Sequence, residues 1–314
     1  MSEASAGNTS VVIPCYNVQK YLGQALDSVR GQTIPVREIV VVDDGSRVPV
    51  KLPARWDGPP LKLFRTENRG LPAARNLGID HCSGEYVAFL DADDAWRPRK
   101  LEMQECALRS RPDAVASFTR CVDEPGYRPL GPYPDATADT AELVRLLWKD
   151  IFFPPSTFMA RRDALLGVGR FDEALRNTGE DVELFLRLLA VGTFVQVPEP
   201  LCYYRDHGEQ MTRDLCRMIK GHKQARGLVI ERHPELLEAA GIARHRFWDA
   251  QRDEVLQVYA RRAYDHARPL LWDHWKENPA DLHLLGCLLV TCLPSPLRGL
   301  LKPAASSKCQ QSAA

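Results

Sequence analysis

Aspartate residues gather at two points of the sequence, and their type and spacing could support metal or phosphate chemistry. One group is Asp43-Asp44, and the other is Asp91-Ala92-Asp93-Asp94. Carboxylates this close together repel one another unless a cation lies among them. Oxygen ligands favour Mg²⁺ or Mn²⁺ over zinc, and such an ion commonly keeps water and substrate phosphates in its shell. The alternative is an Asp-rich turn that caps the next helix. Taken alone, residues 91–94 are equally compatible with a metal site and with a helix-capping turn.

Both aspartate groups directly follow apolar segments that are typical of buried strands, at 39–42 and 86–90. Further strands are predicted at 11–13, 61–64, 114–118 and 157–160. Helices are predicted from an N-cap at Asn17 to a stop at Gly31, and over 71–79, 99–108 and 180–190. This alternation predicts an α/β fold with a mainly parallel sheet and helices on both faces. In such sheets ligands bind beyond the carboxyl ends of the strands, which is where both aspartate groups fall.

The C-terminal third reads differently, because strand patterns stop near residue 217 and helical patterns follow, including one over 244–266. We therefore place a catalytic domain at 1–215 and a helical extension at 216–314. Its most apolar run, 284–293, is ten residues long, whereas a membrane span needs about 20. Two interpretations remain open. One is a helix packed on the domain or on a second subunit, and the other is an interfacial helix on a membrane. The expected apolar face comprises Leu282, Leu285, Leu288, Leu289 and Leu293, with basic Arg298, Lys302 and Lys308 nearby.

Composition narrows the class of protein. The 314 residues include 41 Lys+Arg and 41 Asp+Glu, a balance that argues against nucleic-acid binding. Nine cysteines are scattered without a CxxC pair, which favours reduced thiols in a cytoplasmic protein. The N-terminal residues do not resemble a signal peptide. A P-loop motif is absent, and no GxGxxG follows the first strand, so a P-loop enzyme and a dinucleotide site are both disfavoured.

Five segments, read in order, resemble those of a known family. They are VVIPCYN at 11–17, IVVVDDGS at 39–46, NRGLPAARN at 68–76, GEYVAFLDADD at 84–94 and GED at 179–181, with a weaker sixth, YRDH, at 204–207. Together they span roughly residues 10 to 210. The chain resembles the family 2 glycosyltransferases of the GT-A fold, which are inverting enzymes that use nucleotide sugars.

The resemblance implies a set of nucleotide-binding residues. In this family the tyrosine of the first motif packs on the base, which corresponds to Tyr16, and Pro14 shapes the end of the strand before it. Asp44 would accept a hydrogen bond from the base. Arg75 would lie close to the nucleotide, and Asp91 would bind its ribose. Taken alone, Tyr16 is more often a packing residue than a stacking one.

The resemblance also implies the metal ligands and the catalytic base. Asp93 would bind Mg²⁺ or Mn²⁺, and His207 matches a position that contributes to the metal or diphosphate site in some members. Asp181 would be the base that removes the proton of the attacking hydroxyl. The alternative for Asp181 is a capping box with Thr178 as N-cap. His207 taken alone is equally well explained as an ordinary surface histidine.

We therefore expect the protein to transfer one sugar from a nucleotide-sugar donor to a hydroxyl of a glycan or lipid-linked acceptor. The expected nucleotide of the donor is UDP. The Gln-x-x-Arg-Trp segment of processive synthases is absent, which favours single additions. The alternatives are a nucleotidyltransferase and a non-catalytic nucleotide-sugar-binding module. Val48-Pro49-Val50 departs from the family pattern, so the helix between the second and third strands is expected to be short or missing.

Overall fold

A computed structural model describes residues 7–124, 133–134, 138–149, 153–176, 178–208, 214–243, 249–260 and 264–293. Within them, eight strands form one sheet in the order β3-β2-β1-β4-β7-β6-β8-β5. The strands are β1 (Thr9–Cys15), β2 (Glu38–Asp43), β3 (Leu61–Arg65), β4 (Tyr86–Phe89), β5 (Ala95–Trp96), β6 (Ala114–Glu124), β7 (Phe158–Arg161) and β8 (Thr193–Arg205).

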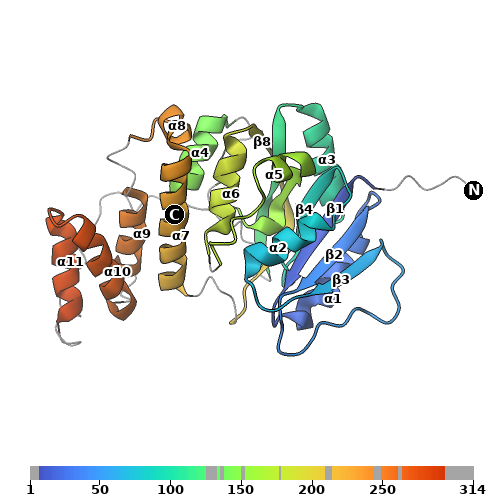
Figure 1. The fold of residues 1–314 in the computed structure, drawn as a ribbon, viewed down its shortest axis with the longest axis horizontal. Helices are drawn as coiled ribbons and strands as arrows, with labels where there is room; N and C mark the ends of the chain where they lie inside the picture. Colours follow the sequence, from blue (N-terminus) through green and yellow to red (C-terminus); the bar gives the residue numbers. More distant parts are fainter. Residues whose placement is uncertain are drawn as a thin grey trace, which may run out of the picture.

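Helices cover both faces of this sheet, as the alternation of patterns predicts (Figure 1). They are α1 (Gln19–Arg30), α2 (Leu71–Asp80), α3 (Lys100–Ser110), α4 (Thr140–Lys149), α5 (Arg162–Gly167), α6 (Glu180–Leu189), α7 (Leu215–Arg232), α8 (Pro234–Ala239), α9 (Asp249–Ala260), α10 (Tyr264–Glu277) and α11 (Leu282–Cys292). A short 3₁₀ turn, Pro155–Thr157, precedes β7.

The parallel part of the sheet is β3, β2, β1 and β4, and it carries both aspartate groups at its carboxyl ends. Beyond β4 the direction changes, because β7 is antiparallel to both β4 and β6. Residues 44–60, between β2 and β3, contain no helix, which confirms the expected departure from the family pattern.

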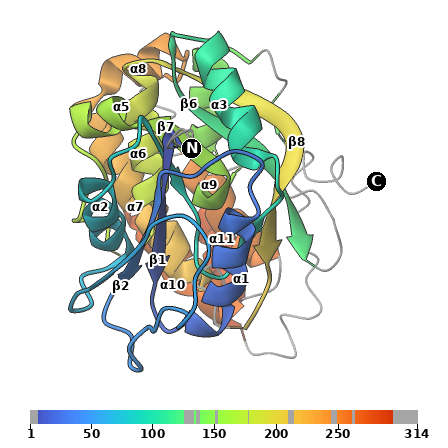
Figure 2. The same ribbon diagram turned by 90° about the vertical axis from the view of Figure 1, so that its right-hand side faces the viewer.

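Alternate residues of β1 enter different halves of the core. Val12 packs in a cluster with α2, α4 and α6. Val11 and Ile13 pack with α1 and α3 on the other face. Figure 2 shows α1 on one side of β1 and α2 on the other. This two-sided burial explains why β1 and β2 read as continuous apolar runs.

Strand β8 is the largest difference from the sequence prediction, which contained no strand there. Pro198 and Pro200 lie inside it, and proline lacks the N–H that a sheet ladder requires. Its pairing with β6 shifts register between Thr119 and Arg120, which accommodates these residues. Helix α4 was also not predicted, and β6 is longer than expected.

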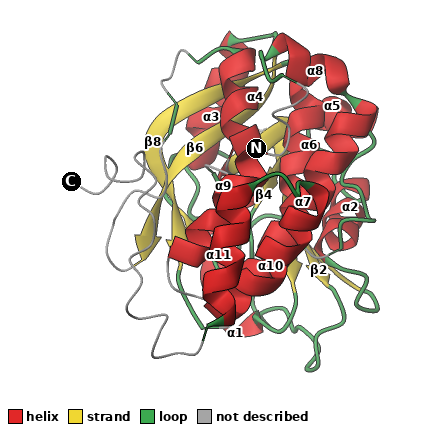
Figure 3. Cartoon of the chain, turned by 90° about the vertical axis from the view of Figure 1, so that its left-hand side faces the viewer, coloured by secondary structure: helices red, strands yellow, loops and turns green. Residues whose placement is uncertain are grey.

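The helical extension begins with α7, which packs on α6, and continues in a small core shared by α7, α9, α10 and α11. Figure 3 shows these helices in front of the sheet. The predicted helical pattern over 244–266 covers α9 and the first residues of α10, and residues 244–248 and 261–263 of it lie outside the described part. The boundary predicted at 215 falls on the first residue of α7.

The buried face of α11 also differs from the expected one. Leu284, Cys287 and Leu288 face the small core, whereas Leu282 and Leu289 are exposed. The reason is that α11 shares its small core with α9 and α10 through Leu284, Cys287 and Leu288, whereas the sequence pattern is apolar on more than one face of the helix. Arg298, Lys302 and Lys308 lie outside the described residues. Among the described helices, none combines the length and the hydropathy that a membrane span requires.

Candidate active site

A pocket of about 850 Å³ opens at the carboxyl ends of β1, β2 and β4. Five sequence-predicted site residues line it: Pro14, Tyr16, Asp44, Asp91 and Asp93. The other three, Arg75, Asp181 and His207, are not among its described lining residues. Arg75 and His207 nevertheless contact lining residues directly, and Asp181 neighbours the partner of Arg75 in the chain. The fold therefore brings the predicted residues into one region.

The tyrosine at the end of β1 stands at the rim of this pocket, with 45% of its surface exposed. The next residue, Asn17, has a left-handed backbone (φ 58°), so it is not the N-cap that we expected for α1. Instead, its backbone N–H donates to Ser46 Oγ at 3.0 Å, and its Oδ1 accepts from the backbone N–H of Arg47 at 2.9 Å. These bonds fasten the loop after β1 to the loop after β2, which fixes the backbone that carries Tyr16.

Asp44 has a structural task that sequence reasoning missed. It is buried, and its Oδ1 accepts from Thr66 Oγ1 and the backbone N–H of Arg69, at 3.1 and 2.9 Å. Its Oδ2 accepts from the backbone N–H of Gly70 at 2.9 Å. Gly70 has φ 97°, which favours glycine. Asp44 thus holds the loop before α2 at the pocket wall, and its contact with a base remains a prediction.

The three carboxylates of the second group have three different environments. Asp91 Oδ1 accepts from Arg75 Nη2 at 2.9 Å, and Asp93 Oδ2 lies 2.8 Å from His207 Nε2. Asp94 is buried and accepts from Ser156 Oγ at 2.5 Å and from the backbone N–H of Arg205 at 3.2 Å. None of them caps α3, whose N-cap Arg99 has no side-chain cap. The capping interpretation of this turn is therefore wrong.

Electrostatics distinguishes the same carboxylates. Burial, then the charges of Asp93 and Asp91, raise the pKa of Asp94 well above its usual value. Burial and the charge of Asp91 also raise the pKa of Asp93, against the lowering effect of His207. A cation beside Asp93 would offset both the repulsion and the loss of hydration.

The residues around Asp93 fit an ion that shares its shell with a substrate. Within the described ranges, no group of three His, Cys, Asp or Glu side chains surrounds a common point. Asp93 and His207 are an adjacent pair at the pocket, while Asp91 is already bound to Arg75. An Mg²⁺ or Mn²⁺ held by this pair would take its remaining ligands from water and phosphate oxygens, as Mg²⁺ commonly does.

A buried arginine connects the aspartate turn to the helix of the predicted base. Arg75 on α2 is 1% exposed, and its Nη1 donates to Glu180 Oε1 at 2.8 Å. Burial and the neighbouring charge of Asp181 raise the pKa of Glu180 to about 7, although Arg75 opposes this. Sequence reasoning missed Glu180; the signal was its position next to Asp181 at the start of an apolar helix.

The predicted base lies in the first turn of α6. Asp181 is partly exposed, and its Oδ1 accepts from the backbone N–H of Val182 at 2.8 Å. Thr178 is not the N-cap, because Gly179 occupies that position with φ 87°, and Thr178 Oγ1 donates to the carbonyl of Arg217 at 3.1 Å. The capping-box interpretation is therefore wrong, whereas the role of Asp181 as a base remains a prediction.

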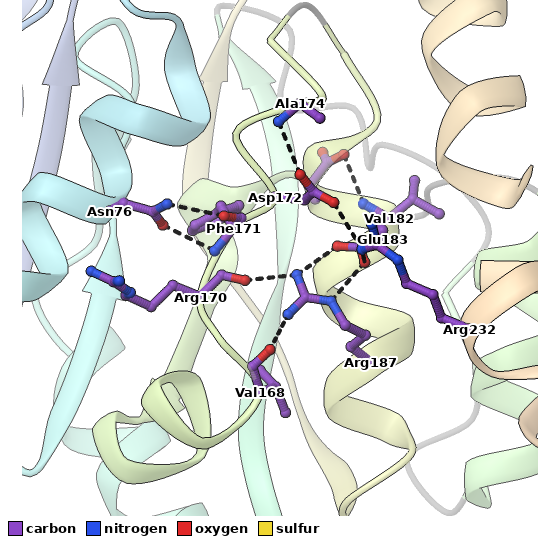
Figure 4. Close-up of polar contacts among 11 residues, drawn as sticks. Asn76, Val168, Arg170, Phe171, Asp172, Ala174, Val182, Glu183, Arg187 and Arg232 are labelled. Atoms are coloured by element: carbon purple, nitrogen blue, oxygen red, sulfur yellow. Dashed lines mark hydrogen bonds and ion pairs between the residues drawn. The ribbon is translucent and has the colours of Figure 1, made fainter. Parts of the chain in front are cut away.

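The loop that leads into α6 is fixed from three sides (Figure 4). Asn76 on α2 exchanges two hydrogen bonds of 2.9 Å with the backbone of Phe171. Arg187 on α6 pairs with Glu183 and donates to the carbonyls of Val168 and Arg170. Arg232 on α7 pairs with Asp172 at 2.8 Å, as Figure 4 also shows. These contacts give the start of α6 a defined position relative to α2.

Comparison with known proteins decides the family. The sequence model described as "Glycosyl transferase family 2" matches residues 10–168, half of the chain. The chain belongs to glycosyl transferase family 2. It is therefore a glycosyltransferase, as the motifs indicate. The matched segment ends before Asp181 and His207, so the assignment of these two residues does not follow from it.

Two relatives illustrate this membership of the family. The amylovoran biosynthesis glycosyltransferase AmsE of Erwinia amylovora is 32% identical over 191 residues, which cover 58% of this chain and 70% of AmsE. An uncharacterized glycosyltransferase of Nostoc is 30% identical over 213 residues, covering 63% of this chain and 65% of that protein. The glycosyltransferase described here thus spans about two thirds of the length of these relatives.

Solved structures support the fold. Residues 1–349 of TarS from S. aureus in complex with UDP-GlcNAc match this glycosyltransferase with a TM-score of 0.56 at 16% identity, covering 91% of this chain and 90% of that one. A second structure of the same segment matches with a TM-score of 0.53. The mixed sheet, its two helical layers and the helical C-terminal region are those of a GT-A glycosyltransferase.

Proposed function

We propose that this glycosyltransferase moves one sugar from a UDP-linked donor to a hydroxyl of a glycan or lipid-linked acceptor, with inversion at the anomeric carbon. One observation carries the proposal. Arg75 pairs with Asp91, two residues before Asp93 of the candidate cation pair, and with Glu180, the residue before the candidate base Asp181, so one buried arginine connects the two segments that carry these groups. TarS was solved with UDP-GlcNAc, and AmsE is named for amylovoran biosynthesis, which supports this class of donor and acceptor.

The proposed reaction is a single in-line displacement. Asp181 takes the proton of the acceptor hydroxyl. The hydroxyl oxygen then attacks the anomeric carbon of the donor sugar, and the bond between that carbon and the diphosphate oxygen breaks. Tyr16 stacks on the base, Asp44 and Asp91 hold the nucleoside, and Pro14 shapes the strand end beneath them. When bound at Asp93 and His207, Mg²⁺ or Mn²⁺ would supply positive charge to the leaving diphosphate.

The direct test is a hydrolysis screen of UDP-, GDP- and CMP-sugars with Mg²⁺, with Mn²⁺ and with a chelator. We expect release of UDP from one class of UDP-sugar, and only with a divalent ion. Release of another nucleotide would correct the donor. Release of pyrophosphate from nucleoside triphosphates and sugar phosphates would favour the nucleotidyltransferase alternative, and tight binding without any turnover would favour the binding module.

We also propose peripheral contact with the cytoplasmic face of a membrane through the extension. Leu282 and Leu289 on α11 and Trp272 on α10 are large apolar side chains that are exposed in the described structure. Exposed leucine and tryptophan on amphipathic helices are typical of interfacial binding. A lipid-linked acceptor would then lie near the enzyme, and this location would place the catalytic domain in the cytoplasm.

A further inference from the structure

The histidine of the proposed metal pair lies where the sheet no longer fixes the chain. His207 follows β8 by two residues, since the strand ends at Arg205. Side-chain contacts therefore orient its ring. Only 9% of the side chain of His207 is exposed, so neighbouring groups cover most of the ring. One of these groups is an aromatic residue from a helix near the beginning of the chain.

Tyr21, in the first turn of α1, packs on His207. The two ring centroids are 5.0 Å apart, and the ring planes are inclined by 38°. This distance lies within the range of favourable aromatic pairs. His207 Nε2 at the same time lies 2.8 Å from Asp93 Oδ2. Tyr21 thus contacts the imidazole ring while one ring nitrogen lies beside Asp93, where the proposed ion would bind.

A second contact of the same tyrosine supports the segment that carries the histidine. The guanidinium of Arg205 lies over the Tyr21 ring, 5.0 Å from its centroid, which is a favourable cation–π geometry. Arg205 also donates to Gln24 Oε1, one turn further along α1, at 2.5 Å. Its Nε donates to the carbonyl of Asp93 at 3.0 Å. Helix α1 therefore contacts both residues, Arg205 and His207, that reach Asp93 from the end of β8.

We propose that Tyr21 is a positioning residue of the metal site, whose ring holds the imidazole of His207 beside Asp93 so that both side chains can bind one Mg²⁺ or Mn²⁺ ion. The inference rests on the proposed function, because it takes Asp93 and His207 as the metal ligands. Residues that contact a metal-binding histidine from outside the coordination shell orient its ring, and their loss commonly weakens metal binding by about 10- to 100-fold. Tyr21 supplies this support through its ring.

The test is Mn²⁺ binding, measured by magnetic resonance in the presence of UDP. We expect Tyr21→Leu to weaken Mn²⁺ binding by about tenfold, because leucine fills part of the space without an aromatic ring. Tyr21→Phe keeps the ring and should bind Mn²⁺ as the unaltered protein does. Phe64→Leu is the matched control, because Phe64 on β3 stacks on a different histidine, His81, with ring centroids 3.9 Å apart.

A double-mutant cycle shows whether Tyr21 acts through His207. His207→Gln should itself weaken Mn²⁺ binding, and the addition of Tyr21→Leu should cause no further loss. UDP binding without a metal should be the same in Tyr21→Leu as in the unaltered protein. If Tyr21→Leu does not fold, Tyr21→Met takes its place, since methionine is flexible enough to fill the gap and also lacks a ring.

Three outcomes overturn the inference: Tyr21→Leu binds Mn²⁺ as tightly as the unaltered protein, Tyr21→Leu and Phe64→Leu lose equal affinity, or the losses of Tyr21→Leu and His207→Gln add. Equal losses in Tyr21→Phe and Tyr21→Leu also overturn it, because the hydroxyl and not the ring would then matter. A loss of metal-free UDP affinity in Tyr21→Leu does so too, because the tyrosine would then act on the donor. Failure of the unaltered protein to bind Mn²⁺ with UDP would instead contradict the proposed metal site itself, and the inference with it, which separates the two results.

Discussion

At the scale of single residues, the catalytic proposal depends on what each carboxylate already contacts. Asp91 is bound by Arg75 and Asp94 by Ser156 and the backbone of Arg205, so both have structural partners. Asp93 faces the pocket beside His207. Asp181 keeps one carboxylate oxygen without a hydrogen bond from the described residues. Asp93 and Asp181 are therefore the side chains to vary first.

The base is tested by Asp181→Asn, which keeps the shape of the side chain but cannot take a proton. We expect turnover to fall by about 10²-fold or more, with donor affinity nearly unchanged. The matched control is Asp163→Asn at the start of α5, where the carboxylate likewise accepts from the N–H of the next residue. Steady-state rates and UDP titration measure both. Full turnover in Asp181→Asn would remove Asp181 from the mechanism.

The metal site is tested by Asp93→Ala. We expect transfer to be lost and Mn²⁺-dependent donor binding to weaken, with little change in melting temperature, because burial and like charges already disfavour this carboxylate. Mn²⁺ binding by magnetic resonance in the presence of UDP is the readout. Asp27→Ala, an exposed aspartate on α1, is the control. Metal-independent transfer by Asp93→Ala would contradict the site.

At the scale of elements, two glycines of α7 explain how this helix fits against the start of α6. A Cβ added to Gly221 would lie 1.7 Å from Thr178 Oγ1 and 2.5 Å from its carbonyl oxygen. A Cβ added to Gly227 would meet nothing within 4 Å. Close approach at Gly221 therefore sets the position of the segment that precedes Asp181.

This pair of glycines gives a matched prediction. Gly227→Ala should raise the free energy of unfolding by up to about 1 kcal/mol, because alanine favours helix. Gly221→Ala should instead lower it by about 1–3 kcal/mol, because Thr178 must move. Turnover should also fall in Gly221→Ala, because Asp181 lies three residues after the displaced Thr178. Chemical denaturation and rate measurements compare the two, and equal effects would show that the contact does not position the base.

At the scale of the whole molecule, the extension divides its apolar residues between two surfaces. Leu284 and Leu288 enter a core with α9 and α10, so deleting α11 would expose that core. The outward residues Leu282 and Leu289 can be changed without this effect. They offer a test of membrane contact that leaves the packing of the extension in place.

We expect the full chain to co-sediment with liposomes that contain anionic lipid at low salt, and Leu282→Ser/Leu289→Ser to reduce the bound fraction. Leu166→Ser, at an exposed leucine of α5, is the control. If the unaltered protein stays in the supernatant, the exposed face does not bind membrane. Sedimentation equilibrium then tests whether the exposed face of α11 forms a contact between two subunits instead.

The sequence by itself determined the parallel part of the sheet and the place of the aspartate groups. Continuous apolar runs at β1, β2 and β4 are local signals, and parallel strands necessarily bring their carboxyl ends to one edge. That reasoning predicted Asp44 and Asp91 at one edge of the sheet, where both line the pocket. It failed at β8, because prolines within a strand remove the local signal.

Only the tertiary structure decided how these residues are connected. The bridge from Asp91 through Arg75 to Glu180 joins positions 16 and 105 residues apart. The carbonyls that hold Arg176 lie 107 and 108 residues away in the chain, and the buried face of α11 depends on which neighbours cover it. Such contacts form between segments whose local patterns are independent of each other, so no periodicity or spacing within either segment encodes them.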